Sequence, residues 1–256
     1  MNSPARAVST PFSWLTARPI AHRGLHDAAR GLIENTAGAV EAAIAAGFGV
    51  EVDVQVSGDG EAMVYHDDAL GRLTEGIERL DRLTAAALKQ APFRGSSERM
   101  MTLSDLCDLV AERATIAIEL KSQFDGDDRL ASRVAEVLAR YSGPAAPMSF
   151  DPHQIRVLRH KAPHIPCGIV AAKYHPHPYW DLMPIWMRQG MGYLLTGLVA
   201  RPQFVAYAVA DLPALAPLFA RRGLGLPLLA WTVRTEAERQ RAMRWADQMI
   251  FEGFRP

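Results

Sequence analysis

The sequence predicts a (β/α)8 TIM barrel built as a single domain, residues 1–256, with short insertions at its rim. Three observations support this fold class. Short apolar segments alternate with longer amphipathic ones along nearly the whole chain, eight candidate strands can be counted among them, and 256 residues is a typical length for one such barrel. An open doubly wound sheet is the alternative, but no GxGxxG motif follows the first strand.

The candidate strands are short runs rich in Val, Ile, Leu and Ala, and turn-forming residues flank most of them. Runs of this kind that alternate with helical segments are typical of parallel strands joined by crossover helices. In chain order, we expect the strands at residues 19–22, 49–53, 115–120, 146–150, 165–170, 204–208, 228–233 and 248–251.

The segments between these strands repeat apolar residues every three or four positions, which is the spacing of one helix face. Several begin at residues that cap helices. Thr102 precedes one segment, Asp151 is followed by Pro152, and Thr235 is followed three positions later by Glu238. The predicted helices span residues 35–46, 103–112, 127–140, 153–160, 180–189, 214–221 and 236–245.

Two segments break the alternation. Residues 67–100 are polar and irregular, and residues 173–201 are rich in proline and aromatic side chains. Both are predicted to be excursions on the barrel rim. No internal repeat or low-complexity tract divides the chain, which favours one domain.

Composition restricts the class of function. Lys plus Arg and Asp plus Glu number 28 each, a formal net charge of +0, whereas nucleic-acid binders usually carry a basic excess. Cys107 and Cys167 form no CxxC pair, so neither a disulfide framework nor a thiolate zinc site is expected. No apolar run reaches signal-peptide or membrane-span length. We therefore expect a cytoplasmic protein without a membrane span, and the oligomeric state is left open.

Polar side chains gather at the carboxyl ends of the early strands. Glu51 and Asp53 lie two positions apart, as do Glu119 and Lys121, and such pairs share one face of a strand. The valines, isoleucines and leucine between them then face the covering helices. In a barrel, three carboxylates and a lysine would therefore point inward at the end where barrel enzymes keep their active sites.

Three converging carboxylates raise one another's pKa values, and a divalent cation removes that conflict. An all-oxygen ligand set suits a hard cation, either Mg²⁺ or Ca²⁺. The alternative is that Glu51, Asp53 and Glu119 pair with Arg or Lys as structural salt bridges. Two nearby histidines favour the metal site.

His22 closes the first strand, and His66 follows a strand-like run at residues 62–65. Two histidines beside an acidic cluster suit general acid–base catalysis near neutral pH. Arg23 and Lys121 add cationic donors, and arginine presents a planar fork to phosphate oxygens. This combination indicates chemistry on a phosphate ester, because a sugar hydrolase needs the carboxylates but not the cations.

Seven short motifs connect these residues to a known family. They are His22-Arg23-Gly24, Glu34-Asn35-Thr36, Glu51-Val52-Asp53, His66-Asp67, Glu119-Leu120-Lys121, Ser149-Phe150-Asp151-Pro152 and Trp231-Thr232-Val233. In these motifs and their order, the sequence resembles the glycerophosphodiester phosphodiesterase family. The resemblance implies a (β/α)8 barrel that uses a divalent metal to hydrolyse glycerophosphodiesters to glycerol 3-phosphate and an alcohol.

The resemblance also implies roles for individual residues. It makes Glu51, Asp53 and Glu119 the metal ligands, and His22 and His66 the acid–base pair. One histidine would deprotonate the nucleophile and the other would protonate the leaving alkoxide, in either assignment. Direct attack by water and attack by the substrate's own glycerol hydroxyl, through a cyclic phosphate, both remain open.

Four further expectations concern the substrate. The resemblance places Arg23 and Lys121 on the phosphate, and Glu34 either near the metal or orienting Arg23. Trp231 would line the glycerol pocket, with a core tryptophan as the alternative. At residues 251–254 the chain reads Phe-Glu-Gly-Phe where many members show Thr-Asp-x-Pro, which bears on the preferred headgroup.

Two alternative functions follow from the same residues. One is a phospholipase D-like barrel that acts on intact lipids through an apolar rim segment. The other is a non-catalytic protein that binds phosphoesters. The preferred partner is a small glycerophosphodiester substrate. The rim segment in question contains Trp180, Met183, Ile185, Trp186 and Met187.

Overall fold

All eight predicted strands are present in the computed structural model. It describes residues 12–176 and 178–256, so residues 1–11 and 177 of the predicted domain 1–256 lie outside the described residues. The strands, which form one sheet, are β1 (Ile20–Ala21), β2 (Gly49–Val56), β3 (Ala62–Val64), β4 (Met101–Thr102), β5 (Ile116–Leu120), β6 (Ala145–Ser149), β7 (Gly168–Ala171), β8 (Phe204–Ala208), β9 (Leu228–Val233) and β10 (Gln248–Phe251).

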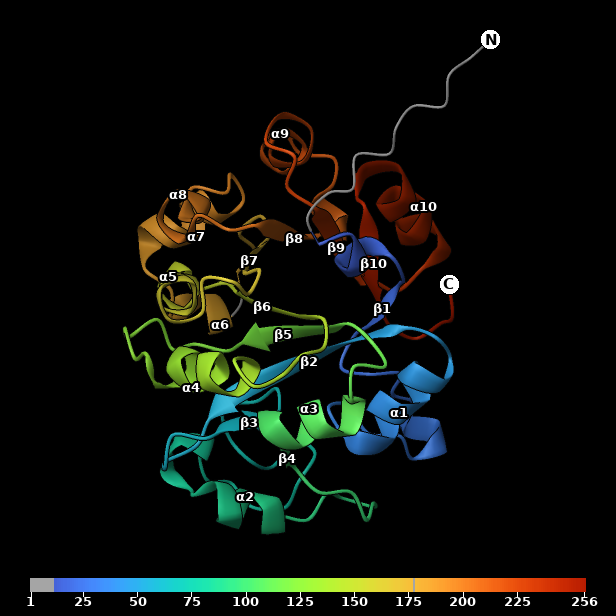
Figure 1. Ribbon diagram of the computed structural model, residues 1–256, viewed down its shortest axis with the longest axis vertical. Coiled ribbons are helices and arrows are strands. Elements are labelled where there is room, and N and C mark those ends of the chain that lie inside the picture. The colour runs from blue at the N-terminus through green and yellow to red at the C-terminus, as the bar shows by residue number, and fades with distance from the viewer. Residues whose placement is uncertain (1–11, 177) are drawn as a thin grey trace.

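Pairing at β1 closes the sheet into a barrel. β1 pairs in parallel with β2 on one side and with β10 on the other, and β5 to β10 complete the parallel ring. Helices lie around the outside of this ring (Figure 1). The predicted single-domain (β/α)8 barrel is therefore confirmed.

The outer helices lie close to their predicted positions, and the predicted caps are present. Thr102 and Thr235 each form a capping box, with Asp105 and Glu238 respectively, and Asp151 accepts a hydrogen bond from the N–H of His153. These helices are α1 (Ala37–Ala45), α3 (Leu103–Val110), α4 (Arg129–Leu138), α5 (Pro152–Lys161), α9 (Leu215–Gly223) and α10 (Glu236–Trp245).

One predicted helix, at residues 180–189, is wrong. The structure divides it into α6 (Pro178–Asp181) and α7 (Ile185–Met191), and Pro184 stands directly before α7. Proline has no N–H to donate, and it disfavours helical backbone at the residue before it. The helix is therefore interrupted at Pro184, although the apolar spacing continues across it. A further helix, α8 (Thr196–Ala200), follows and packs on α5.

The insertion after β2 is a hairpin with its own small core. β3 returns antiparallel along the end of β2, and the N–H of Tyr65 donates to the carbonyl of Asp53 at 3.0 Å. This pairing carries the next residue, His66, to the end of the barrel where Asp53 lies. The insertion also contains α2 (Ala85–Gln90), and its buried side chains are Met63, Tyr65, Leu80, Leu88, Phe93 and Met100.

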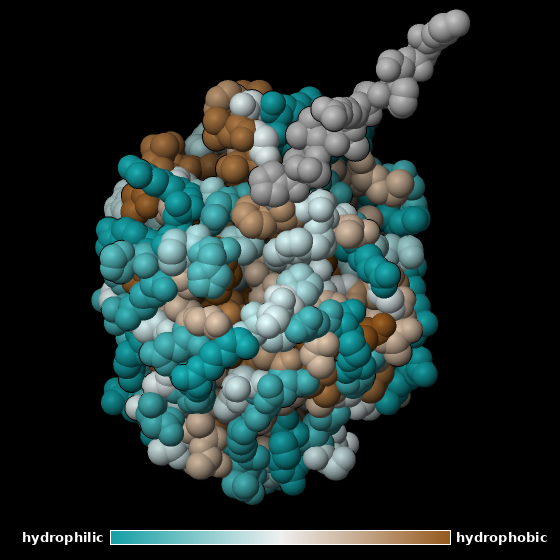
Figure 2. Space-filling view, in the orientation of Figure 1, coloured by the Kyte–Doolittle hydropathy of each residue, from teal (hydrophilic) through white to brown (hydrophobic). Residues whose placement is uncertain are grey.

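Apolar side chains also reach the surface. Figure 2 shows brown residues gathered at the top and upper left, over α8 and α9. Within α8 and α9, the large exposed apolar residues are Leu198, Val199, Leu215 and Phe219. Among the described residues, no helix combines the length and the apolar character needed to cross a membrane.

Candidate active site

Three carboxylates meet where β2 and β5 pair. Glu51 and Asp53 come from β2, and Asp53 pairs in register with Glu119 on β5. One carboxylate oxygen from each residue lies within 4.8 Å of the others, and all three side chains are buried. Oε1 of Glu51 has no hydrogen-bond partner among the described residues. A buried, incompletely paired set of oxygen ligands fits a hard metal ion.

Two cations lie against this cluster. Nζ of Lys121 is 2.8 Å from Oδ1 of Asp53 and 2.5 Å from Oε1 of Glu119. The backbone N–H of Arg23 donates to Oε2 of Glu51 at 3.0 Å, and its Nε lies 3.1 Å from Oδ2 of Asp53. The salt bridges considered as an alternative to a metal site are thus present. Two cations against three carboxylates still leave an excess negative charge, which a metal ion would balance.

The charges shift the carboxyl groups in opposite directions. Burial, with the neighbouring charges of Asp53 and Glu119, raises the pKa of Glu51 well above its usual value. Burial would also raise the pKa of Asp53, but Lys121 and Arg23 outweigh it and hold that pKa far below its usual range. Asp53 is therefore ionised at neutral pH, whereas burial and the neighbouring carboxylates disfavour the ionised form of Glu51.

Asn35 fixes Asp53 in place, a role that the sequence did not indicate. Its Nδ2 donates to Oδ2 of Asp53 at 2.9 Å, and the N–H of Asp53 donates to its Oδ1 at 3.1 Å. Asn35 is buried and has a positive φ of 58°, a conformation that asparagine adopts more readily than most residues. The sequence offered one signal for this role, namely that Asn35 belongs to the motif Glu34-Asn35-Thr36 shared with the family.

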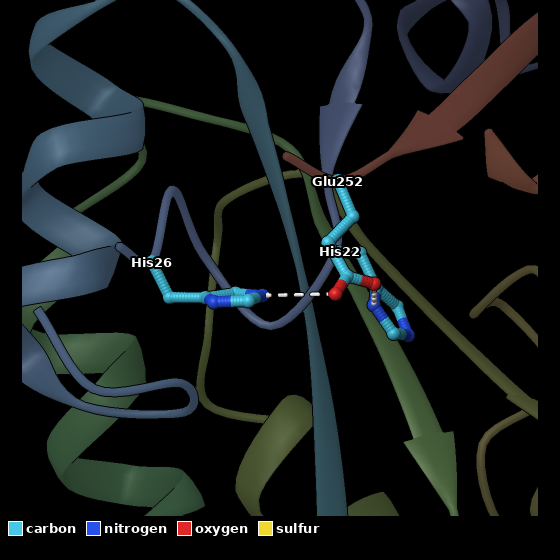
Figure 3. Close-up of side chains that lie close together, drawn as sticks. All are labelled: His22, His26 and Glu252. Carbon is cyan, nitrogen blue, oxygen red and sulfur yellow. Dashed lines mark hydrogen bonds and ion pairs between the residues drawn. The ribbon is translucent and has the colours of Figure 1, made fainter. Parts of the chain in front are cut away.

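The ring of His22 is oriented by a second residue that the sequence did not assign. Nδ1 of His22 lies 2.9 Å from Oε2 of Glu252, while its Nε2 faces Oε2 of Glu51 at 3.9 Å (Figure 3). The hydrogen bond with His22 lowers the pKa of Glu252 to about 2, so Glu252 is an acceptor and Nδ1 carries the hydrogen. Burial lowers the pKa of His22, which favours the neutral ring.

His66 has a carboxylate partner of the same kind. Its Nδ1 lies 2.8 Å from Oδ1 of Asp67. Burial would raise the pKa of Asp67, but hydrogen bonds with His66 and Arg72 lower it to about 2. Asp67 therefore accepts the Nδ1 hydrogen, and Nε2 is the nitrogen left for proton transfer.

Glu34 connects the two halves of the site. Arg23 donates to its Oε1 at 2.8 Å, and Arg72 donates to the same oxygen at 2.7 Å. Arg72 also binds Asp67, the partner of His66, so one chain of ion pairs runs from His66 to Arg23. Glu34 thus contacts Arg23, and its expected role, near the metal or orienting Arg23, stays a prediction.

Trp231 lies at the end of β9 and is only partly buried. Its ring meets that of Phe150 edge to face, with centroids 5.5 Å apart, and Phe150 packs in the same way on Trp180 at 4.9 Å. Nε1 of Trp231 is buried without a hydrogen-bond partner among the described residues. An aromatic wall with one unused donor suits a small ligand that has both CH and OH groups.

Serine side chains brace the strand ends below this wall. Oγ of Ser149 donates to the carbonyl of Leu120 at 2.7 Å, and Oγ of Ser122 donates to Oδ2 of Asp151 at 2.6 Å. Both bonds cross from β5 or its following loop to β6 or its following loop. The matched motif at residues 149–152 thus ties the residues on either side of Lys121 to the end of β6.

Comparison with known sequences gives one family. Residues 22–254 match the model of the glycerophosphoryl diester phosphodiesterase family. A glycerophosphodiester phosphodiesterase of Caldanaerobacter subterraneus subsp. tengcongensis is 28% identical over 163 residues, which cover 59% of this chain and 65% of that relative. Glycerophosphodiester phosphodiesterase 1 of Rattus norvegicus is 32% identical over 117 residues, covering 41% of this chain and 34% of the relative. The chain therefore spans only part of the length of either relative.

Solved structures share the fold. A phosphodiesterase of Oleispira antarctica in complex with the product sn-glycerol-3-phosphate matches with a TM-score of 0.72 and 21% identity, covering 91% of each chain. A glycerophosphodiester phosphodiesterase of Agrobacterium tumefaciens matches with a TM-score of 0.69 and 21% identity, covering 91% of this chain and 94% of the other. At these identities the likeness establishes the barrel, and the chemistry depends on the residues described above.

Proposed function

Because the chain belongs to the glycerophosphoryl diester phosphodiesterase family, we propose that it hydrolyses glycerophosphodiesters to glycerol 3-phosphate and an alcohol. One observation carries the proposal. Two imidazoles, each held by a carboxylate at Nδ1, lie at the same barrel end as three buried carboxylates and two cations. This set can supply what phosphodiester hydrolysis uses, namely proton transfer at two oxygens and positive charge on the phosphate.

Glu51, Asp53 and Glu119 would hold the divalent metal, Mg²⁺ or Ca²⁺. When bound, such an ion polarises a phosphoryl oxygen and lowers the pKa of an attacking hydroxyl. The chain's own contribution is a rigid ligand set: Asn35 fixes Asp53 through two hydrogen bonds, and the N–H of Arg23 fixes Glu51.

The histidines would move the protons. With Nδ1 hydrogen-bonded to Glu252 or Asp67, each neutral ring presents a basic Nε2. One ring takes the proton of the attacking hydroxyl, and the other, in its protonated form, returns a proton to the leaving alkoxide. The adjacent carboxylate stabilises whichever ring carries the positive charge.

Arg23 and Lys121 would meet the phosphate, and Trp231 the glycerol. Both cations already lie at the acidic cluster. Their positive charge is therefore close to the place where the phosphate oxygens of a substrate would bind. The unpartnered Nε1 of Trp231 offers a donor to a glycerol hydroxyl beside an apolar ring face.

The products of the reaction test this proposal. Incubation with glycerophosphocholine or glycerophosphoethanolamine in the presence of Mg²⁺ or Ca²⁺ should release the free alcohol together with glycerol 3-phosphate, which phosphorus NMR identifies. Release of phosphocholine and glycerol instead would mean cleavage of the other ester bond and would contradict the proposal.

The same assay with phosphatidylcholine vesicles addresses the lipid alternative. Of the five side chains considered for lipid contact, Met183 is buried, Trp180 and Met187 pack against the core, and only Ile185 and Trp186 are exposed. We therefore expect no phosphatidate from vesicles. Phosphatidate without any glycerol 3-phosphate from the deacylated substrates would favour the lipid enzyme.

A further inference from the structure

Two imidazoles and one carboxylate form a second cluster outside the acidic one. His22, His26 and Glu252 each place a ligand atom within 4.8 Å of the other two. Figure 3 shows the carboxylate of Glu252 between the two rings, with one oxygen toward each. Oε2 lies 2.9 Å from Nδ1 of His22, and Oε1 lies 3.8 Å from Nε2 of His26. At 3.8 Å the second contact is too long for a hydrogen bond.

Among residues 12–176 and 178–256, no other side chain or backbone group partners His26 and explains its orientation. Its Nε2 is buried and makes no hydrogen bond with any described residue, although it points at a carboxylate. A buried ring nitrogen that faces an anion across a gap is the arrangement expected where a cation fits between them.

The donor set selects the kind of cation. Two imidazole nitrogens and one carboxylate oxygen are typical of zinc, whereas the all-oxygen cluster of Glu51, Asp53 and Glu119 suits Mg²⁺ or Ca²⁺. Ligand atoms about 2.0–2.2 Å from a tetrahedral zinc ion lie about 3.3–3.6 Å from one another. Across the two oxygens of Glu252, the separations are 2.9 Å to Nδ1 of His22 and 3.8 Å to Nε2 of His26, one just below this range and one just above it.

The backbone at all three residues is fixed. The N–H of His22 donates to Phe251 and that of Glu252 to Val233, both at 2.9 Å, which places the two residues on neighbouring strand ends. The N–H groups of Leu25 and Asp27, on either side of His26, donate to Ala39 and Leu32, also at 2.9 Å. The cluster is therefore organised before any ion arrives.

The cluster is also accessible. A groove of about 700 Å³ is lined by His26 and Glu252 together with Asp27, Gly253 and Arg255. It offers an entry path toward His26 and Glu252, whereas His22 does not line it. Arg234 binds Oε2 of Glu252 at 2.8 Å, but its side chain is half exposed and can turn to solvent when a cation takes its place.

We propose that His22, His26 and Glu252 form an inhibitory zinc site. Zinc on Nδ1 of His22 needs that nitrogen without its hydrogen, so the ring's remaining hydrogen moves to Nε2. A neutral ring with hydrogen on Nε2 can no longer accept the proton of a nucleophile, and Glu252 no longer supports a positive charge on it. The binding of zinc stands on the cluster alone, whereas the inhibition rests on the proposed function of His22.

The test compares wild-type protein with His26→Ala and with His160→Ala, which removes an exposed imidazole on α5. Zinc binding is measured by calorimetry on the full chain with Mg²⁺ in excess, which occupies the oxygen ligands. Wild type and His160→Ala should each bind one zinc ion with the same affinity. The affinity of His26→Ala for zinc should be at least about tenfold lower. Equal zinc affinity in all three proteins would overturn the site, whether or not the protein is an active enzyme.

Inhibition is measured on glycerol 3-phosphate release in the same buffer. His26→Ala should keep the basal rate, and its zinc inhibition curve should shift at least about tenfold to higher concentration. His160→Ala should be inhibited like wild type. Zinc binding that leaves the rate of an active enzyme unchanged would overturn the inhibitory role. If the protein releases no glycerol 3-phosphate, the proposed function is overturned. The calorimetric comparison would still test whether His22, His26 and Glu252 bind zinc.

Discussion

Replacing His66 with alanine should lower kcat by about 10²–10⁴-fold, the usual contribution of one acid–base group. The KM should change little, because the ring moves a proton and does not hold the phosphate. The fold should be unaffected, since the side chain is about one third exposed and Asp67 keeps its ion pair with Arg72. Steady-state rates of glycerol 3-phosphate release and thermal unfolding of both proteins measure these two effects.

His164→Ala is the matched control for this loss. It removes an exposed imidazole from the loop before β7, at the other end of the barrel. Its rate should equal that of wild type. If His66→Ala were as active as the control, His66 would have no part in the mechanism.

Replacing Glu51 with glutamine should separate metal binding from stability. The amide keeps the shape and can still accept from the N–H of Arg23, but it removes one of the three negative charges. Affinity for Mg²⁺ or Ca²⁺ should fall at least about tenfold, with activity falling in parallel. Because the pKa of Glu51 is higher in the folded protein than in the unfolded chain, its ionised form opposes folding at neutral pH.

The metal-free variant should therefore be more stable than metal-free wild type. Each kcal/mol gained raises Tm by about 2–4 °C in a protein of this size. Calorimetric titration with each metal and unfolding in EDTA test the two effects, with Glu75→Gln, an exposed glutamate, as the control. Unchanged metal affinity would remove Glu51 from the ligand set, and a lower metal-free Tm would contradict the charge argument.

The barrel strands could be predicted because they are buried on both faces and therefore read as short apolar runs. β2 and β5 mark the site, since Glu51 and Asp53 interrupt the valines of β2 at a spacing of two and Glu119 interrupts the apolar run of β5. The helix predicted at residues 180–189 failed because the apolar spacing continues across Pro184, where the backbone does not.

Contacts within the candidate site could be predicted most directly where residues are close along the chain. His22 and His66 are linked to the acidic cluster by their places at strand ends and by the family resemblance. That Glu51 lies beside Asp53, and Glu119 beside Lys121, follows because side chains two positions apart in a strand point to the same face. The pairing of His22 with Glu252 joins residues 230 positions apart, and it depends on β1 closing against β10. No local pattern indicates such a contact, and the same holds for His26, which meets Glu252 across the closure.

The most direct test of metal-assisted hydrolysis at this site is glycerol 3-phosphate release from glycerophosphocholine by the wild-type chain, before and after EDTA treatment. We expect release to stop when EDTA removes the metal and to return when Mg²⁺ or Ca²⁺ is restored. Release that continues unchanged in EDTA would contradict the role of Glu51, Asp53 and Glu119 as metal ligands. No release by the folded protein with any divalent metal would contradict the proposed reaction itself.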